Sequence, residues 1–208
     1  PAGSALYQGA VETNLDLHSP DNTVLLDLKD GQVVIRMRPD LAPRHVARIK
    51  ELIRQGFYDG LVFHRVIEGF MAQTGDPQGD GTGGSGVFLP AEFSATPFTR
   101  GIVGMARAAH DDGADSQFFI MLADAPHLDG HYTVWGEVIE GMEHVDNITK
   151  GPRETNGEGP EEDSDGIVSV SGAAVAADAD DGAGEAGGDS EEGEDVEGAL
   201  TERRLTGG

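Results

Sequence analysis

Two short apolar runs, residues 24–28 and 33–37, stand on either side of an Asp30-Gly31 pair. Runs of this length that are rich in Val, Leu and Ile are typical of strands, and an Asp-Gly pair between them indicates a hairpin. Before this point, residues 1–21 show no clear periodicity. We therefore predict that regular structure begins near residue 23 with an antiparallel hairpin, after an N-terminal extension.

Residues 40–55 carry the spacing of an amphipathic helix. The apolar residues recur at intervals of three and four positions: Val46, Ile49 and Ile53. In a helix, such a stripe lies on one face and packs against a core. Pro43 suits the first helical turn, Asp40 lies near the expected cap, and Gly56 suits the position after the last turn.

Further short segments have the character of strands. They cover residues 61–67, 70–74, 101–106, 117–122, 133–139 and 167–170. A second short helix is expected over residues 141–149. Many short strands with only two helices predict a mainly β protein, folded as a closed antiparallel barrel capped by the helices. The strand at 167–170 is expected to pair with the first strand and close the sheet.

The end of the chain has a different composition. From residue 171 onward it is dominated by Ala, Gly, Asp, Glu and Ser, with almost no aromatic or branched apolar residues. Such a segment cannot bury enough surface to offset the entropy lost on ordering. We predict three parts: an N-terminal extension (1–21), one domain (22–170) and a disordered acidic tail (171–208).

The net charge of −24 is concentrated toward the C-terminus, where residues 151–208 hold 17 of the 38 acidic residues and three of the 14 basic ones. Nucleic-acid binding needs a basic surface, so this balance argues against a nucleic-acid partner. The scarcity of lysine would also suit life in high salt, but the acidic tail accounts for most of the charge without it.

The sequence contains no run of about 18 apolar residues, so it predicts no membrane span. The first residues, PAGS, have neither an initiator Met nor the charged-then-apolar pattern of a leader. Cysteine is absent, which excludes a disulfide framework, a thiolate nucleophile and a Cys-based zinc site. We expect a monomer in the cytoplasm, with the periplasm as the alternative.

Residues 63–76 read FHRVIEGFMAQTGD and combine features of a binding site. Two strand-like runs are joined by a short turn, and side chains alternate faces along a strand. Arg65 is thus expected to share a face with Phe63, and Met71 with Gln73. A cation beside an apolar pocket, with an amide nearby, suits a ligand that is partly apolar and partly peptide.

Three later motifs supply matching pieces: GMARA at 104–108, SQFFI at 116–120 and LDG at 128–130. Together with FHRVI at 63–67, these motifs resemble the cyclophilins, the peptidyl-prolyl cis–trans isomerases, and the resemblance covers residues 23–170. It implies an eight-stranded barrel with a helix over each end. It also implies an isomerase that acts on X–Pro bonds in peptides and in unfolded or folding proteins, with no cofactor and no metal. Bacterial single-domain members are the most similar.

The resemblance assigns the catalytic role to Arg65, because cyclophilins carry their catalytic arginine in the same FHRVI setting. It also assigns the residues that bind substrate: Phe70, Met71, Phe119 and Leu128 in the proline pocket, Gln73 and Gln117 at the substrate backbone and the adjoining groove, Ala106 and Arg107 along the extended peptide, and His127 and Tyr132 as further contacts.

Three of these positions depart from the pattern of many family members. Members often have Asn in place of Arg107, and the family uses main-chain atoms there, so we expect the change to be tolerated. Members that bind cyclosporin tightly usually have Trp in place of His127 and His in place of Tyr132. The change at His127 removes an indole donor and much contact area, so we expect weak binding of that drug. The change at Tyr132 replaces one polar ring with another and leaves catalysis plausible.

Simpler interpretations stay open for these residues. Arg65 could be an ordinary strand arginine packed on Phe63, and the apolar residues could be plain barrel core. His64 is interpreted as a packing and hydrogen-bonding residue, because isomerisation needs no titrating group. For the whole chain, the main alternative is a proline-binding chaperone or adaptor module with incidental turnover. A weaker alternative makes the acidic tail the working part, docking basic clients.

Residues 79–84, GDGTGG, satisfy the G-x-G-x-x-G pattern of dinucleotide-binding proteins. The residues that follow, 85–90, do not have a helical pattern, so they offer no helix N-terminus to a pyrophosphate. We therefore expect a surface loop beside the substrate groove.

Overall fold

The computed structural model of the 208-residue chain describes residues 5–159 and 164–173. The acidic tail predicted for residues 171–208 therefore lies outside the described residues from 174 onward. Within the described part, ten strands and two α-helices are present. This confirms the mainly β fold with two helices.

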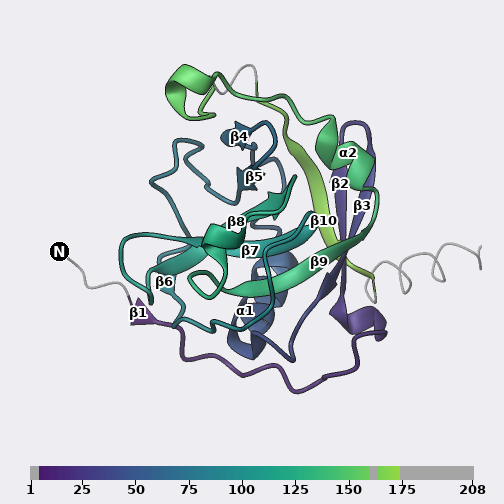
Figure 1. Cartoon of the computed structure of the whole chain (residues 1–208). Helices are drawn as coiled ribbons and strands as arrows, with labels where there is room; N and C mark the ends of the chain where they lie inside the picture. Colours follow the sequence, from purple (N-terminus) through teal and green to yellow (C-terminus); the bar gives the residue numbers. More distant parts are fainter. Residues whose placement is uncertain (1–4, 160–163, 174–208) are drawn as a thin grey trace, which may run out of the picture.

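Eight of the strands form one sheet (Figure 1). In spatial order they are β10 (Ile167–Gly172), β2 (Thr23–Leu28), β3 (Gly31–Met37), β9 (Val134–Glu140), β7 (Ile102–Arg107), β8 (Ala114–Met121), β5 (Met71–Thr74) and β4 (Arg65–Ile67). Every neighbouring pair is antiparallel. The predicted pairing of the last strand with the first hairpin is confirmed, since β10 pairs with β2.

Strands β2 and β3 form the predicted hairpin. Leu28 pairs with Gly31 across the two-residue connection, and Gly31 has a φ of 154°. Along β2, buried and half-buried positions alternate, and Val24 and Leu26 are almost fully buried. The first hairpin therefore packs one face against the core.

Helix α1 (Pro43–Arg54) starts at Pro43 and is followed by Gly56 in a left-handed conformation, as predicted. The prediction for its cap is wrong. The N-cap residue is Ala42, and Asp40 instead forms two hydrogen bonds with Arg38, of 2.8 and 2.7 Å. The ion pair with Arg38 thus draws Asp40 away from the helix terminus.

The first N–H groups of α1 are satisfied from a distant loop. The Glu92 carboxylate accepts hydrogen bonds from the backbone N–H groups of Arg44 and His45, each at 3.0 Å. The Nδ1 atom of His45 lies 2.7 Å from Glu92 Oε2. Because Glu92 is 48 and 47 positions away from these residues, the cap leaves no local signal in the sequence.

The second α-helix, α2 (Met142–Asp146), is shorter than the predicted segment 141–149. Gly141 stands before it in a left-handed conformation, and Asn147 caps its end. Three short 3₁₀ helices complete the helical elements: η1 (Pro20–Asn22), η2 (Pro126–Leu128) and η3 (Arg153–Thr155). None of the helices in the described residues is long and apolar enough to cross a bilayer.

The N-terminal extension contains structure that its sequence pattern did not indicate. Strand β1 (Ala5–Leu6) pairs in parallel with β6 (Val87–Phe88). Farther along, Lys50 on α1 is nearly buried, and its Nζ lies 2.5 Å from Glu12 Oε2 and 2.8 Å from Asn22 Oδ1. A buried ammonium needs such partners. The extension is therefore attached to the domain at two separate places.

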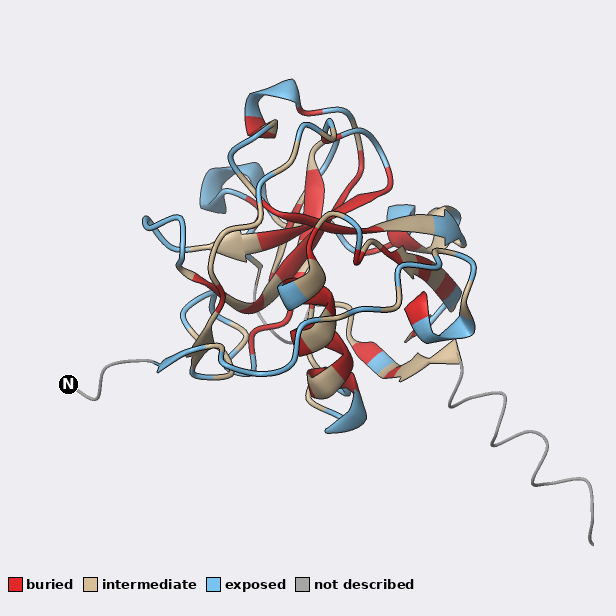
Figure 2. Cartoon of the chain, turned by 90° about the horizontal axis from the view of Figure 1, so that it is seen from below, coloured by how far each residue is buried: buried red, intermediate tan, exposed pale blue. Residues whose placement is uncertain are grey.

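Two apolar clusters fill the interior, and buried residues gather along the strands and on α1 (Figure 2). The larger cluster joins α1 to the sheet and includes Trp135, Tyr58 and Phe63. The smaller cluster includes Met71, Phe119 and Leu128, which were predicted to form the proline pocket. The predicted site therefore rests on an apolar core of its own.

Strands β4 and β10 stand at the two ends of the strand order. The segments that lead into them lie side by side: Val62 and Gly166 form an isolated antiparallel bridge. Hydrogen bonds flank this bridge, including Phe63 N–H to Asp165 O at 2.9 Å and Ile167 N–H to Leu61 O at 2.8 Å. The described strand β4 is shorter than the predicted segment 61–67, because residues 61–63 make these contacts instead of a regular ladder.

Candidate functional site

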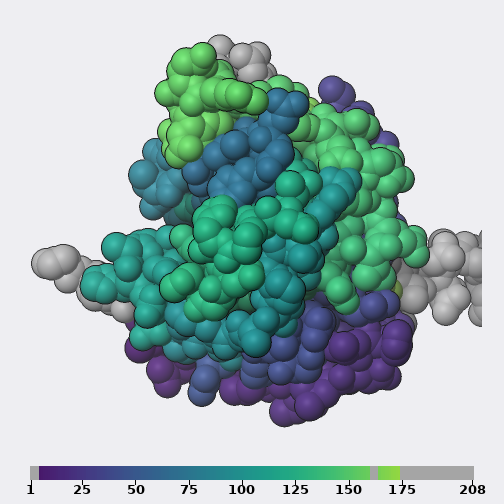
Figure 3. All heavy atoms as spheres, viewed as in Figure 1, coloured from purple at the N-terminus to yellow at the C-terminus, as the bar shows by residue number. Residues whose placement is uncertain are grey.

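A hollow of about 190 Å³ opens where β4, β5, β7 and β8 meet the 3₁₀ helix η2. We call it the first hollow. It is lined by nine residues, all of them predicted as site residues: Arg65, Phe70, Met71, Gln73, Ala106, Arg107, Phe119, Leu128 and Tyr132. Figure 3 shows blue, teal and green parts of the chain, distant in sequence, meeting on this face.

The hairpin of β4 and β5 positions the charged and amide groups. Arg65 and Gln73 are cross-strand partners, and Arg65 Nη1 lies 3.5 Å from Gln73 Oε1. Met71 and Gln73 both line the first hollow, which confirms that they share a face. Phe63 lies before β4 and packs in the larger core, whereas Arg65 lines the first hollow. The prediction that these two side chains share a face is therefore wrong.

An amide chain runs from Arg65 toward a neighbouring loop. Gln73 Nε2 donates to Gln117 Oε1 at 2.9 Å, and Gln117 Nε2 donates to the carbonyl oxygens of Gly81 and Gly83 at 3.0 and 2.8 Å. Amides among apolar residues need such partners. These hydrogen bonds fix the orientation of both glutamines and connect Arg65 to the glycine-rich loop.

The apolar wall of the first hollow is built from stacked aromatic rings. The ring centroids of Phe119 and Phe98 lie 5.7 Å apart, and the Tyr132 ring meets Phe119 edge-on at 5.8 Å. Phe98, which is 1% exposed, was not predicted as a site residue, because none of the motifs contains it. Its backbone N–H donates to Asp129 Oδ1 at 2.7 Å, so the LDG motif holds this aromatic support in place.

Gly104 explains part of the GMARA motif. A Cβ atom at this position would lie 2.6 Å from both Phe119 Cζ and Phe98 Cε1. Atoms cannot approach so closely, and glycine is the residue that permits close approach of a backbone to its neighbours. The stacked rings under the first hollow therefore require glycine at position 104.

Arg107 is fixed more firmly than the resemblance suggested. Its guanidinium carbon lies 4.8 Å from the centroid of the Tyr132 ring. It donates two hydrogen bonds to the carbonyl oxygen of His131, at 3.2 and 3.0 Å, and one to Ala108 O at 3.1 Å. The side chain thus supports Tyr132, one wall of the first hollow.

A second hollow of about 450 Å³ adjoins the first, and Gln73, Ala106 and Arg107 line both. The second hollow is also lined by Gln117 and by residues 81–84 of the glycine-rich loop. Asp115 accepts hydrogen bonds from the N–H groups of Ser85 and Gly86, both at 2.8 Å, and so holds the end of this loop. Residues 79–84 therefore form a loop that adjoins this hollow, and the binding of substrate beside the loop stays a prediction.

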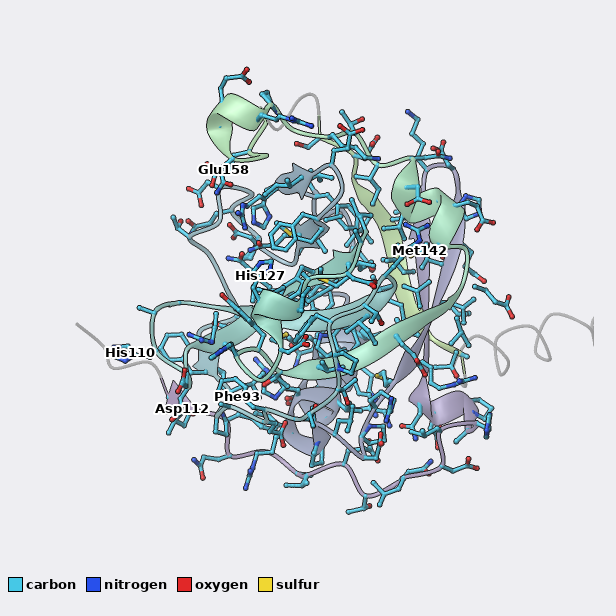
Figure 4. The ribbon with its side chains drawn as sticks, viewed as in Figure 1. Phe93, His110, Asp112, His127, Met142 and Glu158 are labelled. Atoms are coloured by element: carbon cyan, nitrogen blue, oxygen red, sulfur yellow. The ribbon has the colours of Figure 1, made fainter. Side chains whose placement is uncertain are left out.

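His127 lies on η2 (Figure 4) and is not among the residues that line the first hollow, although its neighbour Leu128 is. Its ring centroid lies 5.5 Å from that of Phe70. The structure thus brings His127 beside the residues predicted to bind proline. Its effect on cyclosporin binding stays a prediction.

His64 is 3% exposed, which confirms its packing role. The expected hydrogen bonds are absent, since neither ring nitrogen has a partner in the described part of the chain. Burial is the main cause that lowers the pKa of His64, and nearby Arg65 acts in the same direction. A neutral, unpartnered imidazole fits a residue that fills space behind the strand.

The family comparison decides the identity. The family model described as cyclophilin type peptidyl-prolyl cis-trans isomerase/CLD matches residues 23–171. The chain belongs to the cyclophilin family. Its activity is therefore that of a peptidyl-prolyl cis–trans isomerase, which confirms the enzyme predicted from the sequence.

Curated relatives and solved structures agree with this assignment. A probable peptidyl-prolyl cis-trans isomerase of Brucella suis is 55% identical over 165 residues, covering 74% of this chain and 84% of the relative. Peptidyl-prolyl cis-trans isomerase B of Bacillus subtilis is 45% identical, covering 60% and 88%. The cyclophilin structure from Cryptosporidium parvum, determined in the presence of the dipeptide Ala-Pro, has a TM-score of 0.64 and 28% identity, covering 71% of this chain and 96% of that one.

Proposed function

We propose that this isomerase binds the prolyl ring of its substrate in the first hollow, with Arg65 beside the rotating bond. The observation that carries the proposal is the placement of the Arg65 guanidinium in the lining of a hollow that Met71, Phe119 and Leu128 also line. A compact apolar ring suits such walls, and burial of its surface supplies binding energy. The Ala-Pro dipeptide used with the Cryptosporidium parvum protein supports a ligand of this type.

The reaction requires electrostatic stabilisation and a surface complementary to the twisted amide, and it requires no proton transfer. Rotation about an X–Pro bond is opposed by amide resonance, with a barrier of about 18–20 kcal/mol. As the bond twists, the prolyl nitrogen regains a lone pair that can accept a hydrogen bond. A guanidinium is permanently charged and donates from a rigid plane. A donor placed at that nitrogen stabilises the twisted amide over either planar form, which is what lowers the barrier.

The second hollow extends the site along the peptide. Gln73 and Gln117 are held by their amide chain, and residues 106–107 form one edge that both hollows share. This arrangement supports binding of an extended segment, with the residues before proline lying over the second hollow. Proline-containing stretches of unfolded or folding proteins are substrates of this shape.

The test of the catalytic role is Arg65→Ala. Positioned donors of this kind typically contribute about 2.7–4 kcal/mol, so kcat/KM for a short Ala-Pro peptide should fall roughly 10²–10³-fold. Stability should change little, because Arg65 is half-buried at the surface of the sheet. The matched control is Arg153→Ala, at a side chain that is 88% exposed.

The same experiment separates an enzyme from a binding module. If Arg65→Ala turns over the peptide at nearly the normal rate, Arg65 is not the catalytic group. If the unmodified protein binds proline peptides but does not accelerate the cis-to-trans step, the chaperone or adaptor alternative holds. The alternative that rests on the acidic tail concerns residues beyond 173, outside the described part.

We propose also that the eight-stranded sheet closes into a barrel through the bridge between Val62 and Gly166. The flanking backbone hydrogen bonds support this closure, because they join the segments that precede β4 and β10. The proposed domain covers residues 22–170, and its last strand, β10, runs on to Gly172.

We propose further that the protein is a monomer that acts in the cytoplasm, with the periplasm as the alternative, and that it does not bind nucleic acid. The acidic composition supports the last point, since the chain holds 38 acidic against 14 basic residues. Light scattering at several concentrations tests the first point, and fractionation of the source cells tests the second.

A further inference from the structure

The backbone turns sharply just after η3 (Arg153–Thr155). Among the residues that the structure describes, Asn156 is the one non-glycine residue with a positive φ, at 57°, and its ψ is 35°. Few non-glycine residues adopt this left-handed conformation, and Asn is among the side chains that tolerate it best. Gly157 continues the turn with a φ of 83°. We call this pair the Asn156–Gly157 turn.

Both carbonyl groups of the turn accept hydrogen bonds from β4. Arg65 Nε donates to Asn156 O at 3.1 Å, and the Val66 N–H donates to Gly157 O at 2.9 Å. Residue 65 also forms an isolated antiparallel bridge with Glu158, which Figure 4 labels in this segment. The turn therefore lies along β4, the strand at the end of the sheet order, and reaches the side chain of Arg65 with one carbonyl.

The turn fits too tightly against β4 to slide along it. A Cβ atom on Gly157 would lie 2.5 Å from Ile67 Cγ1 and 2.8 Å from Val66 O. The Gly151 N–H adds a second backbone hydrogen bond, to Val66 O, at 2.9 Å. The position of the Asn156 carbonyl is therefore set by backbone contacts, while residue 156 itself is exposed.

A carbonyl oxygen bound to Nε sets the orientation of the whole guanidinium, because the five N–H groups of the arginine lie in one rigid plane. With Nε held by Asn156 and Nη1 3.5 Å from Gln73 Oε1, the plane is fixed at two points. We propose that the Asn156–Gly157 turn is the positioning element of the isomerase site, and that Asn156 orients Arg65 through its backbone carbonyl. This inference rests on the catalytic role proposed for Arg65.

The test is Asn156→Val. A β-branched residue strongly disfavours the left-handed conformation, so the carbonyl should leave Arg65 and the guanidinium should lose its fixed orientation. Small misplacements of catalytic groups are costly, and we expect kcat for an Ala-Pro peptide to fall about tenfold with little change in KM. Asn156→Gly adopts the same conformation without cost and should keep kcat within about twofold of the unmodified protein.

Two controls separate positioning from a structural effect. Glu154→Val places the same side chain two positions earlier, at an exposed residue of η3, and should leave kcat unchanged. The decisive control repeats Asn156→Val in an Arg65→Ala background. If the turn acts through Arg65, Asn156→Val should cause no further loss of kcat in the Arg65→Ala protein, because the interacting pair is already broken.

Each outcome decides the matter. A tenfold loss that vanishes in the Arg65→Ala background, with kcat restored by Asn156→Gly, supports the inference. An equal loss in both backgrounds, a loss in Asn156→Gly as large as in Asn156→Val, or normal kcat in Asn156→Val overturns it. If Asn156→Val does not fold, Asn156→Ala poses the same question with less strain. Normal turnover by Arg65→Ala alone would instead overturn the catalytic role on which the inference rests.

Discussion

At the scale of single residues, the structure shows how distant side chains complete local features. The carboxylate of Glu92 caps α1 from another part of the chain, and its side chain is 7% exposed. Burial acts to raise the pKa of Glu92, but hydrogen bonds from the His45 ring and from the N–H groups of Arg44 and His45 outweigh it and lower that pKa. Glu92 is therefore held as a charged acceptor in the folded protein.

A lowered pKa in the folded state means that Glu92 stabilises the fold above its unfolded value of 4.5, and that this contribution is lost as the pH falls through the folded value. We predict that Glu92→Gln lowers the free energy of unfolding at pH 7 by about 1.5–3 kcal/mol, the range for hydrogen bonds to charged groups. At a pH well below 4.5, the difference in stability between the variant and the unmodified protein should become small, because Glu92 is then protonated and residue 92 is neutral in both proteins.

Urea unfolding at pH 7 and at acid pH measures this difference. Glu140→Gln is the matched control, because Glu140 is exposed at the end of β9, and it should change stability by less than about 0.5 kcal/mol. A Glu92→Gln protein as stable as the unmodified one at pH 7 would show that the distant cap contributes nothing.

Some residues of the site could be predicted from the sequence, and others could not. Arg65, Phe119 and Leu128 could be placed in the site because short motifs carry them, and the structure gathers them around one hollow. Phe98 and Asn156 could not, because their contacts with Phe119 and Arg65 join segments that no local pattern connects. Supporting residues of this kind are defined by the fold and not by spacing.

At the scale of elements, strands and α1 could be predicted because hydrophobic periodicity and turn residues act locally. The hairpin of β2 and β3 and the start of α1 at Pro43 follow from such signals. Strand β1 (Ala5–Leu6) could not be predicted, because two exposed residues form it only by pairing with β6. The N-terminal extension thus gains its structure from the domain on which it lies.

This extension reaches the wall of the second hollow. The Tyr7 N–H donates to the carbonyl oxygen of Phe88, which lines that hollow, at 2.7 Å. The guanidinium carbon of Arg48 lies 5.8 Å from the centroid of the Tyr7 ring, and Arg48 also donates to Ser85 Oγ at 3.0 Å. A segment outside the matched family model, which begins at residue 23, therefore supports the loop beside the groove.

We predict that Tyr7→Ala raises KM for peptides that extend over the second hollow and leaves kcat nearly unchanged. A partly exposed cation–π contact is worth about 0.5–1 kcal/mol, so the rise should be roughly two- to fivefold. Steady-state assays with a peptide of several residues before proline, compared with a short Ala-Pro peptide, measure it. Leu15→Ala, at a residue 58% exposed elsewhere in the extension, should have no effect; an unchanged KM in Tyr7→Ala would contradict the support proposed for the loop.

At the scale of the whole molecule, the proposed end of the domain rests on the last strand. Strand β10 (Ile167–Gly172) pairs with β2 as far as Gly172 and Val24. Ile167 and Val170 are 2% and 9% exposed, so both belong to the core. The strand therefore joins the C-terminal part of the domain to its first hairpin and covers an edge of β2.

We predict that ending the chain after Gly172 leaves the melting temperature and the isomerase rate almost unchanged. Ending it before Asp165 removes β10, exposes the apolar residues it covers and leaves β2 with unpaired backbone groups, which promotes aggregation. A stop after Val170 removes only the pairs of residues 171 and 172 with β2, and should cause an intermediate loss of stability.

Thermal unfolding and the cis-to-trans rate of an Ala-Pro peptide, measured for the three truncations and the full chain, test this order of stabilities. If the stop after Gly172 alone abolishes folding or turnover, residues beyond 172 are part of the structural domain and the proposed boundary is wrong.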